Sequence, residues 1–236
     1  MLNLNINQSI TFKSIKPDTY NSIYKNEKNH NGRNPDEKII QTTEKYFPQK
    51  EALIADIGAG DGRNAIPIAK LGYKVDAFEI SEVGREIICK KAQDMPNLKV
   101  LSDDLLSQPL KNTYDEIFLS HVTQHFDAKD MEKSFENLFN SLKQGGILIF
   151  DALIDKNDDV EPPNEKNIKN GRSHFKPDFI RNLAEKYNFH VLEIENFKEK
   201  ASSKGFYFGP HWGFPDICGE VKPKEIALKW FTLKKL

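Results

Sequence analysis

Short apolar runs recur along the chain from Glu51 onward, and the stretches between them are long enough for helices. The first five runs lack strict alternation of apolar and polar residues, which is typical of strands whose two sheet faces are both covered by helices. This alternation of strands and helices predicts an α/β fold with a doubly wound, Rossmann-like sheet. The predicted strands are residues 52–58, 74–80, 98–101, 115–120 and 147–152, and two further β-like runs follow at 191–197 and 226–233.

The clearest helix is predicted between the fourth and fifth strands. Asp127 is a suitable N-cap, and Gly145-Gly146 is expected to end the helix. Between them, apolar side chains repeat with the spacing of one helical face; they are Met131, Phe135, Leu138, Phe139 and Leu142. Pro177 favours the start of a further helix that runs through Tyr187.

The first 35 residues are rich in Asn, Lys and Ser, a composition that favours turns over helices. We therefore predict an N-terminal arm or lid over residues 1–35 and a single domain over residues 36–236. The arm is expected to bury little. Tyr20 and Tyr24, at spacing i, i+4, can nevertheless share one face of a short helix.

Composition excludes several classes of protein. The chain has 236 residues, 38% of them hydrophobic, and a formal net charge of −1, which argues against nucleic acid or an anionic membrane as the main partner. Two cysteines are too few for a disulfide scaffold or a four-thiolate zinc site. The sequence shows no signal-peptide pattern and no apolar run long enough to span a membrane, so we expect a cytoplasmic protein. We expect it to be a monomer or a homodimer.

The most informative motif follows the first predicted strand. Asp56 precedes three glycines at every second position, Gly58, Gly60 and Gly62, and a helix follows. Such a turn lets a ligand approach the backbone closely, and the helix directs free N–H groups toward it. A dinucleotide fingerprint requires a third glycine at the position of Arg63, so the motif disfavours NAD and an oxidoreductase.

Acidic residues at two later strand ends extend this site. Glu79 ends the second predicted strand, where a carboxylate can accept both hydroxyls of a ribose. Asp104 follows the third strand and can accept from an adenine amino group, while the Leu105 N–H reaches a ring nitrogen. The three features together support an adenosine ligand without choosing among such ligands.

From these residues the chain resembles the class I S-adenosylmethionine-dependent methyltransferases, over roughly residues 39–236. The stretch GDGRNAIPIAKLGYKVDAFEISEVG is most similar to the small-molecule group that includes the tellurite-resistance and thiopurine methyltransferases. The resemblance implies a seven-stranded sheet with six parallel strands. The last strand, 226–233, would run antiparallel and be inserted on the side of the fourth strand through a hairpin from 191–197.

The resemblance also implies the cofactor, S-adenosyl-L-methionine, with S-adenosyl-L-homocysteine as product, and the residues that bind it. Gly58, Ala59 and Gly60 would contact the methionine part, Glu79 the ribose, Asp104 and Leu105 the adenine, and Ser120 and His121 the carboxypropyl side. The neighbouring Asp56, Arg63 and Ile80 complete the predicted cofactor site. The sequence departs from the commonest family pattern in having Ala59 and Asp61 between the glycines and Glu instead of Asp at position 79.

The methyl acceptor is expected beyond the carboxyl end of the fourth strand. His121 and His125 follow that strand, and their spacing allows both to lie on one helical face. Either is a candidate general base if the acceptor loses a proton. It is equally plausible that each is a packed loop residue without a catalytic role. A metal is not expected, because no third ligand is evident.

The acceptor site is expected to draw on three segments: the arm, the exit of the fourth strand, and the aromatic loop GFYFGPHW. Its candidate residues are Tyr20, Tyr24, His174, His211 and Trp212. The favoured function is methyl transfer to an O, N or S atom of a small molecule. The alternatives are an RNA or protein methyltransferase, disfavoured by the neutral charge and by the lack of an N-P-P-Y-type tetrapeptide, and a non-catalytic S-adenosylmethionine-binding protein.

Overall fold

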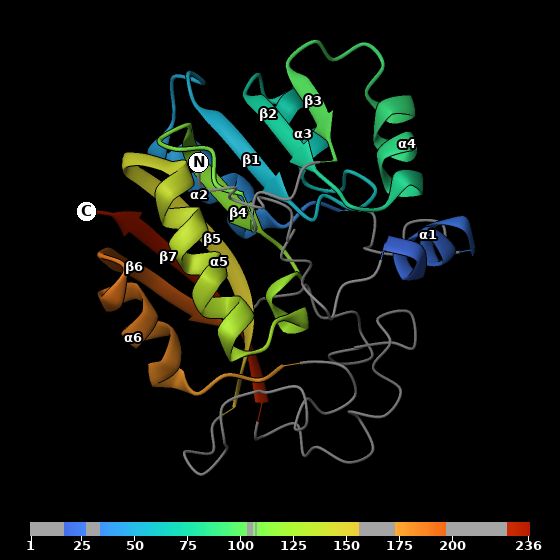
Figure 1. Ribbon diagram of the computed structural model, residues 1–236. Helices are drawn as coiled ribbons and strands as arrows, with labels where there is room; N and C mark the ends of the chain where they lie inside the picture. The colour runs from blue at the N-terminus through green and yellow to red at the C-terminus, as the bar shows by residue number, and fades with distance from the viewer. Residues whose placement is uncertain (1–16, 27–33, 103–105, 107, 156–172, 197–225) are drawn as a thin grey trace, which may run out of the picture.

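The computed structural model describes residues 17–26, 34–102, 106, 108–155, 173–196 and 226–236. In these residues, seven strands form one sheet in the order β3-β2-β1-β4-β5-β7-β6 (Figure 1). The strands are β1 Leu53–Ile57, β2 Lys74–Phe78, β3 Leu98–Leu101, β4 Tyr114–Leu119, β5 Leu142–Asp155, β6 Phe189–Asn196 and β7 Ile226–Lys235. The helices are α1 Pro17–Asn26, α2 Glu37–Tyr46, α3 Ala65–Lys70, α4 Glu82–Lys91, α5 Ala128–Ser141 and α6 Pro177–Lys186, with a short 3₁₀ helix, Thr123–His125.

The strand directions confirm the predicted fold. The pairs from β3 through β5 are all parallel, whereas β7 runs antiparallel to both of its neighbours, β5 and β6. β7 is thus inserted between β5 and β6, and its antiparallel direction is the one that the family resemblance implies. The order along the sheet reverses between β1 and β4, and this switch point is where ligands of open α/β sheets bind.

The boundary predicted between the helix after β4 and the fifth strand is wrong. α5 has its N-cap at Asp127, whose side chain accepts from the Asp130 N–H, but the helix ends at Ser141 and not at the glycine pair. Leu142 is already extended and pairs with Tyr114 of β4. Gly145, at φ 76°, lies instead in the β5 segment where the pairing with β4 shifts register, and the left-handed region is open to glycine.

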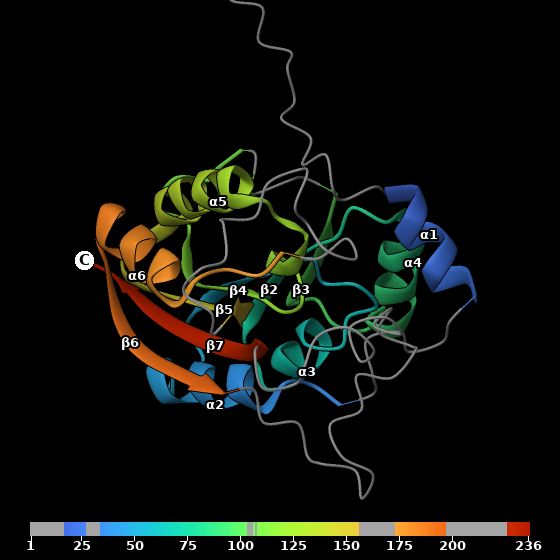
Figure 2. The ribbon, with the colours of Figure 1, turned by 90° about the horizontal axis from the view of Figure 1, so that it is seen from below.

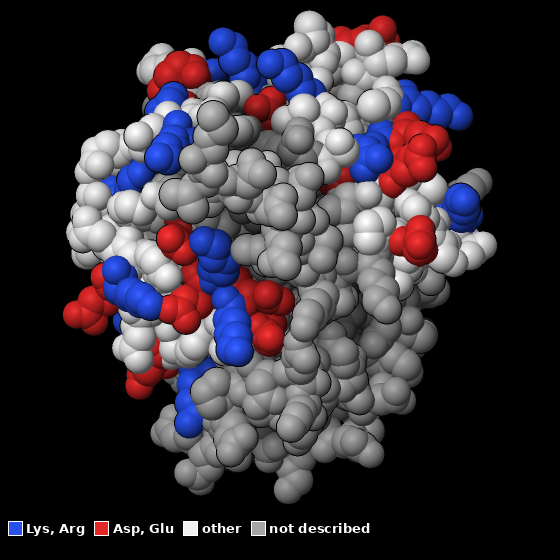
Figure 3. Space-filling view, viewed as in Figure 1, with Lys and Arg blue, Asp and Glu red and all other residues white. Residues whose placement is uncertain are grey.

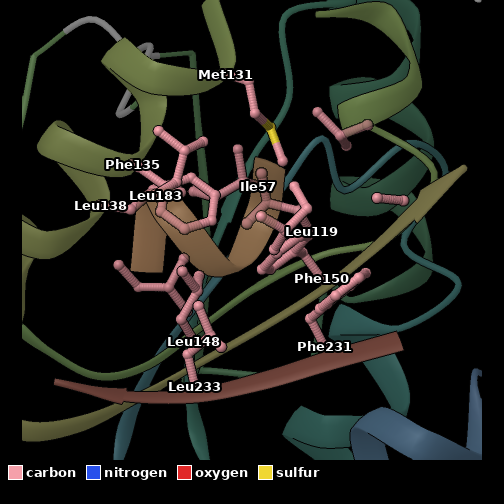
Figure 4. Close-up of a cluster of buried hydrophobic side chains, with 14 of the residues drawn as sticks. Ile57, Leu119, Met131, Phe135, Leu138, Leu148, Phe150, Leu183, Phe231 and Leu233 are labelled. Atoms are coloured by element: carbon pink, nitrogen blue, oxygen red, sulfur yellow. The ribbon is translucent and has the colours of Figure 1, made fainter. Parts of the chain in front are cut away.

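Helices cover both faces of the sheet, as predicted (Figure 2). α2, α3 and α4 contribute to a core that includes Ile39, Ile68, Tyr73 and Ile88. α5 and α6 cover the opposite face, where Met131, Phe135, Leu138 and Leu183 meet strand residues such as Leu148 and Phe150 (Figure 4). The apolar residues of the α5 repeat therefore lie at the interface with the sheet, and burial of this face stabilises the helix.

α1 confirms the short helix expected around the two tyrosines. The Tyr20 and Tyr24 ring centroids are 6.1 Å apart. Tyr24 is only 8% exposed, and a Cβ added at Gly84 of α4 would lie 3.3 Å from its ring. The expectation that the arm buries little is therefore wrong for Tyr24, because the absence of a side chain at Gly84 lets α1 pack closely on α4.

Glu116 is a carboxyl buried within the sheet, away from the carboxyl edge. It is 0% exposed, and burial raises its pKa to about 8. The Thr43 hydroxyl lies 2.6 Å from Glu116 Oε1 and 2.9 Å from the Ile39 carbonyl oxygen. Since that hydroxyl carries one hydrogen, both contacts are hydrogen bonds when a protonated Glu116 donates to Thr43.

We expect Glu116 to make the protein less stable as pH rises from about 4.5 to 8. In that range the unfolded carboxyl is ionised while the folded one retains its proton, so the folded state binds more protons and unfolding is favoured by rising pH. Each pKa unit is worth about 1.4 kcal/mol. Glu116→Gln keeps a donor for Thr43 and should unfold at higher urea than wild type at pH 9, by about 2 kcal/mol or more, with the two curves converging near pH 4.5. Curves that stay parallel would contradict this.

Candidate functional site: the carboxyl edge of the sheet

The glycine turn after β1 is held against β2 by its backbone. The N–H groups of Gly58 and Ala59 both donate to the Phe78 carbonyl, at 2.8 and 3.0 Å. Gly58, Gly60 and Gly62 have φ values of 73°, 62° and 84°, a region that glycine adopts without strain. Gly58 is exposed while its neighbours in the turn are buried, so a bare stretch of backbone faces outward at the switch point.

Asp56 and Glu79 are buried carboxyl groups on either side of this turn. Asp56 is 2% exposed, and its Oδ2 has no hydrogen-bond partner among the described residues. Burial raises its pKa well above the ordinary value, and the nearby charge of Glu79 raises it further, while Arg63 opposes the rise. The charge of Glu79 thus disfavours ionisation of Asp56, and a nearby cation would favour it.

Glu79 also organises the turn. Its two oxygens accept from the N–H groups of Gly60 and Ser81, at 2.6 and 2.7 Å. Burial raises its pKa to about 7 in spite of these hydrogen bonds. The Ile80 N–H is a third backbone donor to this carboxyl. A carboxylate offers about four lone pairs, so one acceptor position remains for a ligand. The next residue, Ile80, is half-buried and accepts from Arg85 through its carbonyl.

Asp36, which the sequence analysis did not identify, lies directly before α2 and pairs with Arg63. The guanidinium donates to both carboxylate oxygens, at 2.9 and 2.6 Å, and also to the Ser120 hydroxyl at 3.1 Å. Ser120 and Asn64 donate to Asp36 as well. Burial acts to raise the pKa of Asp36, but the Arg63 charge and its other partners outweigh it and hold the pKa below the ordinary value. Arg63 thus fixes the start of α2 to the end of β4.

The two histidines after β4 do not share a helical face, contrary to the expectation. The 3₁₀ helix begins only at Thr123, and His121 adopts a left-handed conformation with φ 59°. Asp151 of β5 explains the difference, because its Oδ1 accepts from the His121 N–H at 2.8 Å and its Oδ2 lies 3.1 Å from Nδ1. His125 instead faces α1.

The arm and the exit of β4 come together, as predicted. The Tyr20 hydroxyl lies 2.7 Å from His125 Nε2, and the two rings meet edge to face. The neighbouring Asn21 anchors α1 at the other side, where its Oδ1 accepts from the Ser81 hydroxyl at 2.7 Å. α1 therefore bridges the ends of β2 and β4 across the carboxyl edge.

The remaining candidates are placed only in part. His174 lies beside the 3₁₀ helix, because the preceding Ser173 N–H donates to the Gln124 carbonyl at 2.7 Å. The predicted adenine residues Asp104 and Leu105 and the loop residues His211 and Trp212 lie outside the described residues. Within the described part of the chain, no three His, Cys, Asp or Glu side chains could hold a metal ion, and no helix is long and apolar enough to span a membrane.

The sequence model of a family described as "Methyltransferase domain" matches residues 54–146, which run from β1 into β5. Residues 54–146 of the chain are thus similar to a methyltransferase domain. This confirms the resemblance inferred from the glycine motif, and S-adenosylmethionine is the methyl donor of such domains.

Relatives match the methyltransferase domain only over part of their length. An uncharacterized methyltransferase of Alkaliphilus oremlandii is 27% identical over 108 residues, 45% of this chain and 49% of that protein. The tRNA U34 carboxymethyltransferase of Ruthia magnifica is 30% identical over 111 residues, 45% of this chain and 34% of that protein. The matched part thus spans about half or less of these relatives.

Two solved structures share the fold at low identity. TehB of Haemophilus influenzae superposes with a TM-score of 0.60 at 14% identity, over 84% of this chain and 62% of that one. The 1,6-didemethyltoxoflavin-N1-methyltransferase of Burkholderia thailandensis, with its substrate and S-adenosylhomocysteine bound, gives 0.63 at 12% identity, over 94% and 91%. These likenesses establish the fold, while the acceptor has to be argued from the site.

The residues at the carboxyl edge fit the methyl donor. S-adenosylmethionine carries a sulfonium and an ammonium group, and Asp56 offers a buried oxygen that has no hydrogen-bond partner among the described residues. Gly58 leaves backbone exposed at the same place, and Glu79 keeps an acceptor position for a ribose hydroxyl.

Glu79→Gln should weaken S-adenosylhomocysteine binding about ten- to hundredfold, because hydrogen bonds to a charged group are worth about 1.5–3 kcal/mol each. The pKa of about 7 adds a pH signature. If the ligand binds the ionised carboxylate, affinity for wild type rises as pH increases from 6 to 8 and binding releases a proton. Calorimetry in buffers of different ionisation enthalpy measures both effects, and the variant should lose the pH dependence. Unchanged affinity in Glu79→Gln would place the ribose elsewhere.

Proposed function

We propose that the protein transfers a methyl group from S-adenosylmethionine to a nucleophilic O, N or S atom of a small molecule. The observation that supports a small-molecule acceptor is the position of α1. Through Asn21 at Ser81 and Tyr20 at His125, this helix crosses the edge of the sheet beside the glycine turn. A segment lying across the approach to the donor favours a compact acceptor over a nucleic acid or a folded protein.

The site residues have distinct roles in this proposal. The backbone at Gly58 contacts the methionine part of the donor, Asp56 holds its cationic end, and Glu79 accepts from the ribose hydroxyls. Bound in this way, the donor supplies an electrophilic methyl group. Alignment of the acceptor with that group supplies most of the rate enhancement, because an in-line displacement depends on geometry.

Charge supports the same conclusion. The chain has a formal net charge of −1, and the described surface in Figure 3 intersperses basic with acidic side chains without gathering the basic ones into a patch. A protein that binds RNA tightly neutralises phosphates with a cluster of Lys and Arg side chains. The tRNA-modifying relative matches this chain over only 34% of its own length, so it gives little support to an RNA acceptor.

A turnover screen tests the proposal. Purified protein with S-adenosylmethionine is offered small thiols, phenols, amines and carboxylates, and, in parallel, total RNA and a protein extract, while S-adenosylhomocysteine is quantified. We expect release that depends on a small-molecule class and is absent in Gly58→Val. Turnover with RNA or protein alone would support the alternative acceptors. Binding of S-adenosylhomocysteine without turnover on any class would favour a non-catalytic binding protein.

A further inference from the structure

Asp151 fixes both the backbone and the ring of His121. The two contacts, 2.8 Å to Oδ1 and 3.1 Å to Oδ2, come from one carboxyl group that is 1% exposed on β5. The backbone of His121 is left-handed, with φ 59°, which is uncommon for a residue other than glycine. Strained residues of this kind cluster at functional sites, where the surrounding structure holds a side chain in one orientation.

The pair lies against the donor site. Val122 follows His121, and a Cβ added at Gly58 would approach Val122 Cγ2 to 2.6 Å. Ser120 precedes it and donates to Asp36, whose charge interacts with His121. His125, the other candidate base, has its Nε2 2.7 Å from the Tyr20 hydroxyl of α1.

We propose that Asp151 is a positioning residue that makes His121 the general base for the methyl acceptor. The proposal rests on the methyltransferase function proposed above and names the class of acceptor. That class is an amine or a phenol that loses a proton during transfer, because an acceptor thiol already ionised at neutral to alkaline pH would not need the pair.

The chemistry follows from the side of the ring that Asp151 contacts. A carboxylate beside Nδ1 keeps the proton of the neutral imidazole on that nitrogen and leaves the lone pair on Nε2. As the acceptor lone pair forms the bond to the methyl carbon, the carbon–sulfur electron pair returns to sulfur and the acceptor proton passes to Nε2. The Asp151 carboxylate then stabilises the imidazolium.

Neighbouring charges set the range in which the pair titrates. Burial is the main reason why the pKa of Asp151 is raised to about 8. The hydrogen bond from the His121 N–H and the charge of Arg63 act to lower this pKa, and the charge of Asp36 acts to raise it. The other titratable group near this end of β4 is His125 of the 3₁₀ helix, which contacts Tyr20 of α1. Because interacting groups titrate as a unit, the proton-accepting form of the pair increases as pH rises toward 8, and turnover should rise with it.

Imidazole ¹⁵N NMR of the full chain tests the pairing without an acceptor. At pH 9 we expect the proton of neutral His121 on Nδ1 in wild type. In Asp151→Asn the amide donates to Nδ1, so the proton moves to Nε2. A proton on Nε2 in the wild-type protein would overturn the proposal.

Kinetics supply the second readout. Asp151→Asn should lower kcat for an amine or phenol about hundredfold or more, leave KM for S-adenosylmethionine within about threefold, and flatten the rise of kcat with pH. Glu116→Gln is the matched control, since it removes an equally buried carboxyl from β4 and should keep kcat. Equal losses in both variants would show a general structural effect and reject the role of Asp151. If wild type turns over no acceptor, the proposed function fails. The NMR measurement of the His121 tautomer still tests whether Asp151 orients His121.

Discussion

Gly58→Val should reduce S-adenosylhomocysteine binding by at least about hundredfold and lower the free energy of unfolding by about 2–4 kcal/mol. The backbone at Gly58 has φ 73°, which a β-branched residue rarely adopts. A Cβ at this position would also lie 2.6 Å from Val122 Cγ2, well inside van der Waals contact. The new side chain further occupies the exposed backbone that the methionine part of the donor is proposed to contact. Calorimetry and urea unfolding measure the two losses.

Two further variants separate these causes. Gly72→Ala places a side chain at φ 101° with no atom within 4 Å, so it reports backbone strain alone and should leave binding unchanged. The double variant Gly58→Ala with Val122→Ala removes the clashing methyl group and should regain stability without regaining affinity. If the double variant binds S-adenosylhomocysteine as tightly as wild type, Gly58 does not contact the donor.

The sequence predicted the centre of the sheet well because β1 and β4 are short apolar runs that are almost entirely buried. It also predicted the turn at Gly58 and the acid at Glu79, since both follow directly from a strand end. Because these features are local, residue type and spacing are enough to predict them. The antiparallel seventh strand came from the family resemblance, because its insertion between β5 and β6 is not readable from the run itself.

Residues whose roles depend on distant partners could not be predicted in the same way. Asp36 stands before an amphipathic run, which is a recognisable helix start, but nothing in the sequence pairs it with Arg63. Asp151 ends a predicted strand, and only the adjacency of β4 and β5 brings it to His121. That contact also explains why His121 and His125 do not lie on one helical face in spite of their spacing. The tertiary hydrogen bond fixes the backbone of His121, and the 3₁₀ helix begins only after this residue.

Removal of residues 1–30 should lower turnover about hundredfold while leaving the domain folded. The deletion takes away Tyr20 at His125 and Asn21 at Ser81, and with them the segment that crosses the carboxyl edge. It also uncovers the surface at Gly84 that Tyr24 packs on, so we expect a loss of stability of about 1–2 kcal/mol. Turnover with the acceptor found in the screen and urea unfolding measure the two effects.

Tyr20→Phe isolates the hydroxyl, since it keeps the edge-to-face ring contact with His125, whose centroid is 5.9 Å away. We expect turnover to fall about tenfold, in line with the loss of one hydrogen bond of about 1–1.5 kcal/mol, with S-adenosylhomocysteine affinity unchanged. Asn26→Ala, at the exposed end of the same helix, is the matched control and should behave as wild type. If the truncated protein retained full turnover, α1 would not cover the acceptor. The acceptor site would then have to be formed by residues 155–172 and the aromatic loop around His211, since these are the other segments that the sequence leaves free of the core.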